Sequence, residues 1–359
     1  MTAPSSAISC RTKRWLEETE KWPRDPLRYF AEFPFHEAYY PLGLPLEIST
    51  NHKGVLAAAR QSWGPFPLMQ PAPKINLRFG VSETARSDLP RRPTFGAQRG
   101  LICIISDSEN FGICDVPGGF GFSWVSSATV GDAAFFRYHF LDLMIGLLLA
   151  PIHFAIVHAA CVAYEGHGFL LCGNSGAGKS TLAFGCARKG WTFISDDAGY
   201  APLGNDDGTV IGNPLYIRLR KDAADLFPQL NEQAIMLRPN GEFGFEIATD
   251  RLPEVTTAFK CKVEHIVFLN RDKTGSAKLT ALPTEEAQCR LERVLEYTLA
   301  CKLACDHVGP QAEMALANPE ARQEQKASIR RLLCAEVHEL SYSNLDDAID
   351  CLQSAVRRS

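Results

Sequence analysis

The chain has 359 residues, of which 46% are hydrophobic and 22% are charged, and its formal net charge is −4. This length accommodates two domains, or one large domain with additions, and the composition is that of a globular protein with a sizeable buried core. The slightly acidic balance excludes the strongly basic surface typical of nucleic-acid-binding proteins, so we expect no nucleic-acid partner.

The cysteines and the apolar segments bear on where the protein works. The 12 cysteines are scattered and form no C-x-x-C pair, which favours buried reduced thiols over a disulfide framework. The N-terminus lacks the long apolar stretch of a secretory signal. The most apolar segment, residues 140–163, contains Asp142, Pro151, His153 and His158, which would be costly in lipid. We therefore expect a cytoplasmic protein without a membrane partner.

Residues 1–130 form a first compositional unit, in which Pro, Gly, aromatic residues and short β-like runs are frequent. Three such runs lie at residues 101–105, 111–116 and 121–125, and Pro-Gly-Gly marks a turn between the last two. We predict a mostly β (α+β) N-terminal domain here, a candidate for substrate or partner recognition.

Residues 131–359 alternate predicted strands and helices, which indicates an α/β domain. The pattern predicts a helix over residues 129–150, ending before Pro151. A strand at residues 159–164 follows, and a tight turn leads from it into the next strand, so we expect a hairpin.

Residues 173–180 read G-N-S-G-A-G-K-S, a complete Walker A pattern. Such a loop turns backbone N–H groups toward a di- or triphosphate, its Lys reaches the β- and γ-phosphates, and its Ser binds Mg²⁺. An apolar run at residues 169–172 predicts a strand before the loop, and a predicted helix after it ends at Gly190. The residues expected to bind a nucleotide are Gly173, Asn174, Ser175, Gly176, Ala177, Gly178, Lys179, Ser180 and Thr181.

Two adjacent carboxylates, Asp196 and Asp197, follow a predicted strand at residues 191–195. In folds with such a loop, a carboxylate at a neighbouring strand end binds Mg²⁺ directly or through water, and a second one can take a proton from an attacking hydroxyl. We expect both to be catalytic together with Lys179, and Ser180 and Asp197 to be metal ligands. Which Asp is the base stays open, and the alternative is a solvated turn or a helix N-cap.

Three more residues complete the candidate site. His158 precedes the strand that leads into the hairpin, from where it could tune an Asp or contact the transferred phosphate, although a His in an apolar run is more often a core residue. Arg218 and Arg220 share one face of a predicted strand and could clamp a phosphoryl group. A solvated basic face explains the two arginines about as well.

The run from His158 through Asp197 resembles the catalytic domain of bacterial HPr kinase/phosphorylase. In that family a His opens a strand, and a G-x-S-G-x-G-K-S loop, a helix and a strand ending in Asp-Asp follow at similar spacing. The resemblance is weaker over the rest of residues 137–357. It implies a fold shared with phosphoenolpyruvate carboxykinase and phosphoryl transfer from ATP to a hydroxyl with Mg²⁺, in which Lys179 and Ser180 bind phosphate and metal.

The sequence departs from that family at three places. Asn174 stands where the family usually has Asp, and Thr181 stands where Glu is common. The family's E-I-R-G-L-G signature is absent, and residues 216–220 read Y-I-R-L-R. The resemblance therefore leaves the acceptor, the reverse phosphorolysis and the assembly open, and a homo-oligomer is compatible with the sequence.

We predict an ATP- and Mg²⁺-dependent kinase that acts on a Ser or Thr of a protein or peptide, or on a small-molecule hydroxyl. One alternative is a nucleotide-binding regulatory module with little or no transferase activity. Another is a carboxykinase-like enzyme, for which His153 and His167 would be metal ligands without recognisable spacing. The expected partners are the nucleotide and an unidentified hydroxyl-bearing acceptor.

Overall fold

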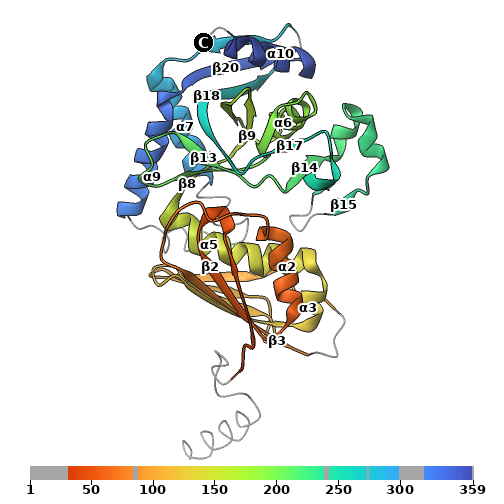
Figure 1. The fold of residues 1–359 in the computed structure, drawn as a ribbon, viewed down its shortest axis with the longest axis vertical. Coiled ribbons are helices and arrows are strands. Elements are labelled where there is room, and N and C mark those ends of the chain that lie inside the picture. The colour runs from red at the N-terminus through yellow and green to blue at the C-terminus, as the bar shows by residue number, and fades with distance from the viewer. Residues whose placement is uncertain (1–30, 84–87, 238–241, 273–274, 299–318, 358–359) are drawn as a thin grey trace, which may run out of the picture.

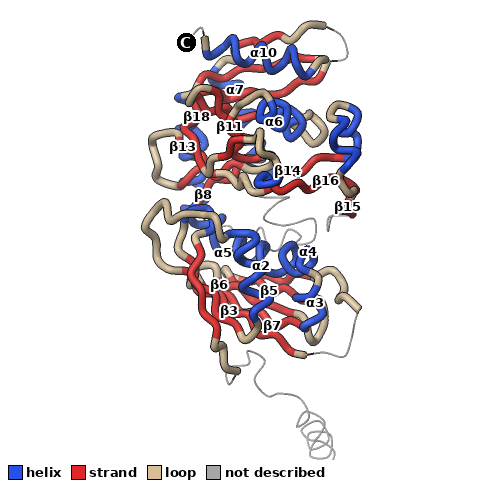
Figure 2. The backbone as a smooth tube through the Cα atoms, turned by 45° about the vertical axis from the view of Figure 1, so that its right-hand side comes forward, coloured by secondary structure: helices blue, strands red, loops and turns tan. Residues whose placement is uncertain are grey.

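The computed structural model describes residues 31–83, 88–237, 242–272, 275–298 and 319–357. They form a mixed α/β structure with two large sheets and one small one. Figure 1 shows the two large sheets one above the other, and Figure 2 shows the helices that lie between them.

The first sheet has seven strands in the order β1-β2-β3-β7-β6-β5-β4. Strand β3 pairs in parallel with β2 and β7, and the remaining pairs are antiparallel. The three runs expected between residues 101 and 125 are confirmed as β5, β6 and β7, with ends that differ by at most one residue. The strands are β1 Phe35–Tyr39, β2 Leu46–Thr50, β3 Ile75–Ser82, β4 Thr94–Gln98, β5 Leu101–Ile105, β6 Phe111–Asp115 and β7 Phe120–Ser126.

Helices cover the face of this sheet that is turned toward the second sheet (Figure 1). They are α2 Lys53–Trp63, α3 Ser127–Gly131, α4 Ala133–Phe136, a π-helical turn Arg137–Leu141 and α5 Asp142–His153. The prediction that the helix ends before Pro151 is wrong, because α5 continues to His153. A proline in the last turn of a helix removes only one backbone bond, and the buried carbonyl of Pro151 accepts a hydrogen bond from Gln325 Nε2 at 3.1 Å.

Within the described residues, one helical stretch, Ala133–His153, is long and apolar enough to cross a membrane by length and composition. Of its most apolar part, 56% is buried inside the protein. A core helix of a globular protein shows the same burial, and α5 contributes Met144, Leu147 and Leu148 to the core of the first sheet. The stretch is weak evidence for a membrane, and the expected absence of a membrane partner stays a prediction.

The second large sheet has ten strands. Its main path is β17-β11-β9-β10-β18-β13-β12-β8, and β20 pairs with both β18 and β19. The strands are β8 Phe154–Val157, β9 Ala159–Tyr164, β10 His167–Cys172, β11 Thr192–Ser195, β12 Gly199–Pro202, β13 Thr209–Ile211, β17 Thr256–Thr257, β18 Lys260–Arg271, β19 Lys278–Ala281 and β20 Glu336–Tyr342.

Helices lie on both faces of the second sheet because its central strands are apolar on both sides. Along β10, Phe169 and Leu171 pack with α6 Lys179–Arg188 and α10 Leu345–Val356. Leu170 and Cys172 point to the opposite face and pack with α7 Thr284–Thr298 and α9 Pro319–Arg331. The small third sheet, of β14 Tyr216–Arg220, β15 Met236–Leu237 and β16 Phe243–Ala248, packs on the α6 side.

The two large sheets are joined through apolar contacts. The core of the first sheet includes Phe154, Ile156 and Ile211 from strands of the second. The rings of Phe66 and Phe259 lie 4.6 Å apart between their centroids. The same core contains side chains of α5, which follows residue 130, and of strands that precede residue 130. The expected division of the chain at residue 130 stays a prediction.

Leu148 tests how far this shared core stabilises the fold. It lies on α5 and is fully buried, so Leu148→Ala removes buried methyl groups and leaves a cavity. We expect the free energy of unfolding to fall by about 2–5 kcal/mol in denaturant titrations. Leu68→Ala is the control, because Leu68 is 56% exposed, and we expect a change within about 0.5 kcal/mol. Equal losses in both variants would contradict the central position of α5.

Candidate functional site

Strand directions bring the expected site residues to one edge of the second sheet. Strands β10 and β11 both pair antiparallel with β9, so they run in the same direction and end at the same edge. The residue before β9 lies at that edge too, because Ala159 is the partner of Cys172. His158, the loop that follows Cys172, and the residues after β11 therefore meet, and the expected β9–β10 hairpin is confirmed.

Residues 173–180, called the glycine loop below, connect the end of β10 to the start of α6. Gly176 and Gly178 have φ values of 84° and 93°, a region that favours glycine. A Cβ atom on Gly178 would lie 2.5 Å from the hydroxyl oxygen of Tyr342. That hydroxyl donates a hydrogen bond to the carbonyl of Ala177 at 3.1 Å, so the end of β20 supports the loop.

Lys179, the first residue of α6, is buried in this loop. Its ammonium donates to the carbonyl oxygens of Gly173 at 2.8 Å and Asn174 at 3.2 Å. These contacts place the ammonium group within the curve of the loop, where the motif needs it for a phosphate. Thr181 follows in the first turn of α6, and its expected role in nucleotide binding stays a prediction.

Asp196 is buried, with an exposed fraction of 3%. Its Oδ2 accepts a hydrogen bond from the backbone N–H of Arg218 at 2.6 Å. Its carbonyl oxygen accepts one from the hydroxyl of Ser180 at 3.1 Å. Asp196 therefore connects α6, the end of β11 and β14, and it is not part of a solvated turn.

Asp197 points elsewhere, and its side chain is 50% exposed. Nδ1 of His158 donates to the carbonyl oxygen of Asp197 at 2.9 Å and lies 3.2 Å from the Oδ1 of the same residue. The side chain of Ser195 accepts hydrogen bonds from the N–H groups of Asp197 and Ala198, which fixes this turn. The result is an accessible carboxylate beside a partly buried imidazole.

The two arginines of β14 have different partners although they share one face of the strand. Nε of Arg218 donates to Glu246 Oε2 at 2.8 Å. Burial opposes its charge, but Glu246 and the carboxylates of Asp196 and Asp197 together raise the pKa of Arg218 above its ordinary value. Arg220 instead reaches the glycine loop, where its Nη2 donates to Ser175 Oγ at 3.0 Å.

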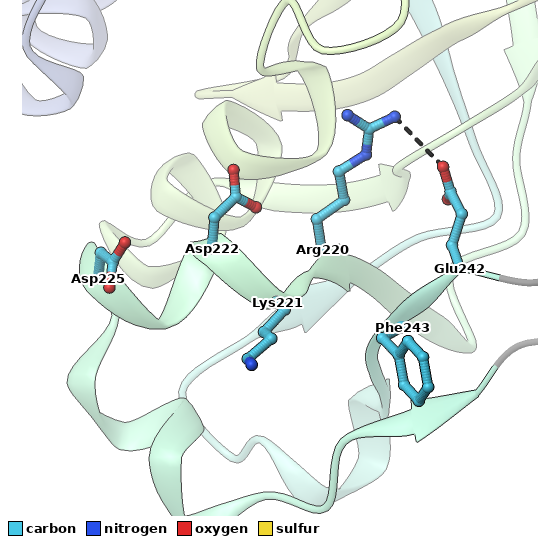
Figure 3. A pocket seen from close by; sticks show the side chains of 6 residues that line it. All are labelled: Arg220, Lys221, Asp222, Asp225, Glu242 and Phe243. Atoms are coloured by element: carbon cyan, nitrogen blue, oxygen red, sulfur yellow. Dashed lines mark hydrogen bonds and ion pairs between the residues drawn. The ribbon is translucent and has the colours of Figure 1, made fainter.

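A groove of about 630 Å³ lies beside Arg220. Figure 3 shows Arg220 turned toward Glu242, which accepts a hydrogen bond from it at 3.4 Å, while Lys221 points the other way. The lining has both signs of charge and one exposed aromatic ring. It consists of Arg220, Lys221, Asp222, Asp225, Glu242 and Phe243.

Sequence reasoning missed the residues that reach the site from the helical layer. Arg137 donates from Nε to Ser62 Oγ at 2.7 Å, and its guanidinium lies 5.2 Å from the ring centre of Tyr216 on β14. Asp142 accepts a hydrogen bond from Trp63 Nε1 at 2.9 Å, and burial raises the pKa of its carboxyl. From the sequence, Asp142 was noted only as a residue that would be costly to place in lipid. No local pattern indicated the contacts of Arg137 and Asp142.

The metal ligands suggested for a carboxykinase-like site are not brought together. His153 ends α5, and burial lowers the pKa of its ring. His167 lies at the start of β10, at the opposite end of that strand from the glycine loop, and its Nδ1 is bonded to Glu264. The structure therefore gives this alternative no support.

Comparisons with known proteins give little more. No protein-family model matches the chain, and no curated protein matches it. Among solved structures, the chain is similar to the HPr(Ser) kinase/phosphatase from Coxiella burnetii, with 11% sequence identity and a TM-score of 0.28. The similarity covers 56% of this chain and 97% of that one. So low a TM-score carries no argument about function, which has to be inferred from the residues themselves.

The reactivity of the Cys172 thiol reports whether water is excluded from the start of the glycine loop. Burial raises its pKa to about 12, although Lys179 opposes this shift, so the unreactive thiol form predominates below that pH. At about pH 8.5 we expect iodoacetamide to leave Cys172 unmodified in the folded protein, since its thiolate fraction is roughly 10³-fold below that of an ordinary cysteine. Peptide mass spectrometry should show the exposed Cys289 and Cys334 alkylated. Equal alkylation rates at Cys172 and Cys289 would contradict the exclusion of water from this site.

Proposed function

We propose that the protein is an ATP- and Mg²⁺-dependent kinase that transfers the γ-phosphoryl group to a hydroxyl of an acceptor. The observation that supports this most is the meeting, at one sheet edge, of three functional groups: the glycine loop with Lys179, the accessible Asp197 beside His158, and Arg220 against the loop. Phosphoryl transfer needs a cradle for phosphates, a group that takes the acceptor's proton, and cations that offset the charge of the moving phosphoryl group.

The nucleotide would be held by the glycine loop. Backbone N–H groups of such a loop bind phosphate oxygens, and the start of α6 adds the positive end of a helix dipole. Lys179 would exchange its contacts with the carbonyl oxygens of Gly173 and Asn174 for phosphate oxygens. Tyr342 supports the loop from behind through the carbonyl of Ala177 and keeps its shape during this exchange.

Ser180 is the residue we assign to Mg²⁺, together with the phosphates. Its hydroxyl oxygen suits a hard cation, and its hydrogen bond to the Asp196 carbonyl holds it at the sheet edge. Bound there, Mg²⁺ would neutralise charge on the phosphates. The sequence suggested Asp197 as a second ligand, but a carboxylate on Mg²⁺ loses affinity for a proton. We therefore assign Asp197 to the acceptor and not to the metal.

The acceptor hydroxyl would be positioned by Asp197. Its half-exposed carboxylate is open to an incoming group, and His158 holds it through Nδ1. Asp196 is a positioning residue in this proposal, because it is buried and its carboxylate is bound to the backbone N–H of Arg218. The proton of the hydroxyl passes to Asp197 as the new O–P bond forms and the bond to the leaving ADP breaks.

Variants of Lys179 and Asp197 distinguish nucleotide binding from phosphoryl transfer. Lys179→Ala should weaken ATP binding and lower transfer by at least about 10²-fold, because the phosphates lose their buried cation. Asp197→Asn should keep ATP binding within about threefold but lower transfer by about 10²–10⁴-fold, because the amide cannot take the proton. Calorimetry with ATP and Mg²⁺, and transfer of labelled phosphate in a lysate that supplies acceptors, measure the two quantities.

The control for these variants is Lys189→Ala, at the end of the same helix, where Lys189 pairs on the surface with Asp346 and Asp350. It should behave like the unchanged protein. ATP binding that survives Lys179→Ala would refute the proposed function. Tight ATP binding without transfer or hydrolysis in the unchanged protein would favour the regulatory module instead.

Arg220 and its neighbour Lys221 form a matched pair for testing charge stabilisation. Arg220→Gln removes the cation that reaches the glycine loop through Ser175, and we expect kcat to fall by about 10–10³-fold. Lys221→Gln removes an equal charge from a side chain that points away from Arg220, and we expect a change in kcat below about threefold (Figure 3). Equal effects of both changes on kcat would show that only the general charge of the groove matters.

A further inference from the structure

Three side chains with metal-binding atoms meet on one face of β18 and β20. His265 and Glu336 are partners in the parallel pairing of these strands, and His338 lies two residues after Glu336, so all three share a face. One ligand atom from each lies within 4.8 Å of the other two. Nδ1 of His265 is 3.6 Å from Oε2 of Glu336, which is beyond hydrogen-bond distance.

The imidazole of His265 has no hydrogen-bond partner for either nitrogen among the described residues, although the residue is only 2% exposed. Nδ1 of His338 is also buried without a partner in that part of the chain. Buried polar atoms in folded proteins are nearly always bonded, so three such atoms in two neighbouring rings need an explanation. A bound cation would supply a partner for one nitrogen of each ring.

Packing fixes the ring of His265 in its place. The ring stacks on Phe169, with 4.4 Å between centroids and 20° between planes. Nδ1 of the ring therefore faces Glu336, and the stacking limits the freedom of the ring to turn toward another partner.

We propose that His265, Glu336 and His338 bind a divalent transition-metal ion of the zinc type. Two imidazoles and one carboxylate are a common zinc set, whereas Mg²⁺ and Ca²⁺ prefer oxygen ligands alone. Ligands at about 2.0–2.1 Å from a tetrahedral zinc ion lie roughly 3.3 Å from each other, close to the separation of His265 and Glu336. The side chain of Glu336 is 57% exposed, so an ion can enter there and a water molecule can take the fourth position.

The role of this ion would be structural. Phe169 is the register partner of His265, and the glycine loop begins four residues after Phe169, so roughly 13 Å of strand separates the two sites. The ion would tie β18 to β20 at the end of the sheet that lies away from the loop. This proposal does not depend on the kinase activity, because no residue is shared between the two sites.

Metal binding to the whole chain tests the proposal. The protein is stripped with a chelator, kept reduced, and titrated with Zn²⁺ against a chromophoric chelator in excess Mg²⁺, which occupies oxygen-only sites. We expect one tightly bound Zn²⁺ per chain and a rise in the melting temperature. Co²⁺ in place of Zn²⁺ should show the visible bands of a tetrahedral ion without a thiolate-to-metal charge-transfer band.

Variants locate the ion. Glu336→Gln changes an exposed side chain, so it should fold normally and bind Zn²⁺ at least about 10-fold more weakly. His338→Ala should lose stoichiometric binding, while His36→Gln, on the exposed edge of the first sheet, should bind like the unchanged protein. The proposal is overturned by the absence of stoichiometric Zn²⁺ binding, by unchanged affinity in both site variants, or by a thiolate band that assigns the ion to cysteines.

Discussion

The buried carboxylate of Asp196 is the constraint on which the geometry of the candidate site depends. Its side chain holds the backbone of Arg218, and its own carbonyl holds the hydroxyl of Ser180. These two bonds join the start of α6 to the end of β11 and to β14, three segments that no single strand pairing connects. Because Arg220 lies two residues after Arg218, the same bonds decide where its guanidinium meets the glycine loop.

This arrangement explains why the adjacent residues Asp196 and Asp197 differ so much in burial. Successive side chains after a strand point in different directions, so Asp196 enters the interior while Asp197 reaches solvent. The buried residue gives rigidity, since its partner is a backbone N–H that cannot move independently. The exposed residue keeps its carboxylate available, with His158 as its support. Two neighbours in the chain thus have different surroundings, one buried against the backbone and the other half-exposed beside His158.

Local sequence patterns were sufficient to predict part of the fold and some of the residues that meet at the candidate site. Runs of apolar residues bounded by turns predicted β5, β6 and β7, and the hairpin before the glycine loop, because these contacts are short in sequence. Glu242 and Tyr342 could not be found this way. The first reaches Arg220 through the pairing of β14 with β16, and the second reaches Ala177 across 165 residues. Arg218 and Arg220 look equivalent in sequence, and only their partners distinguish them.

The bond from Tyr342 to Ala177 also has a consequence for the order in which the protein is made. Chains leave the ribosome from the N-terminus, and domains fold as their segments become available. The glycine loop is synthesised near the middle of the chain, but the strand that supports it is among the last parts to appear. The loop therefore reaches its final form only when β20 has joined β18, so a truncated translation product contains the whole Walker A pattern without the support that shapes it.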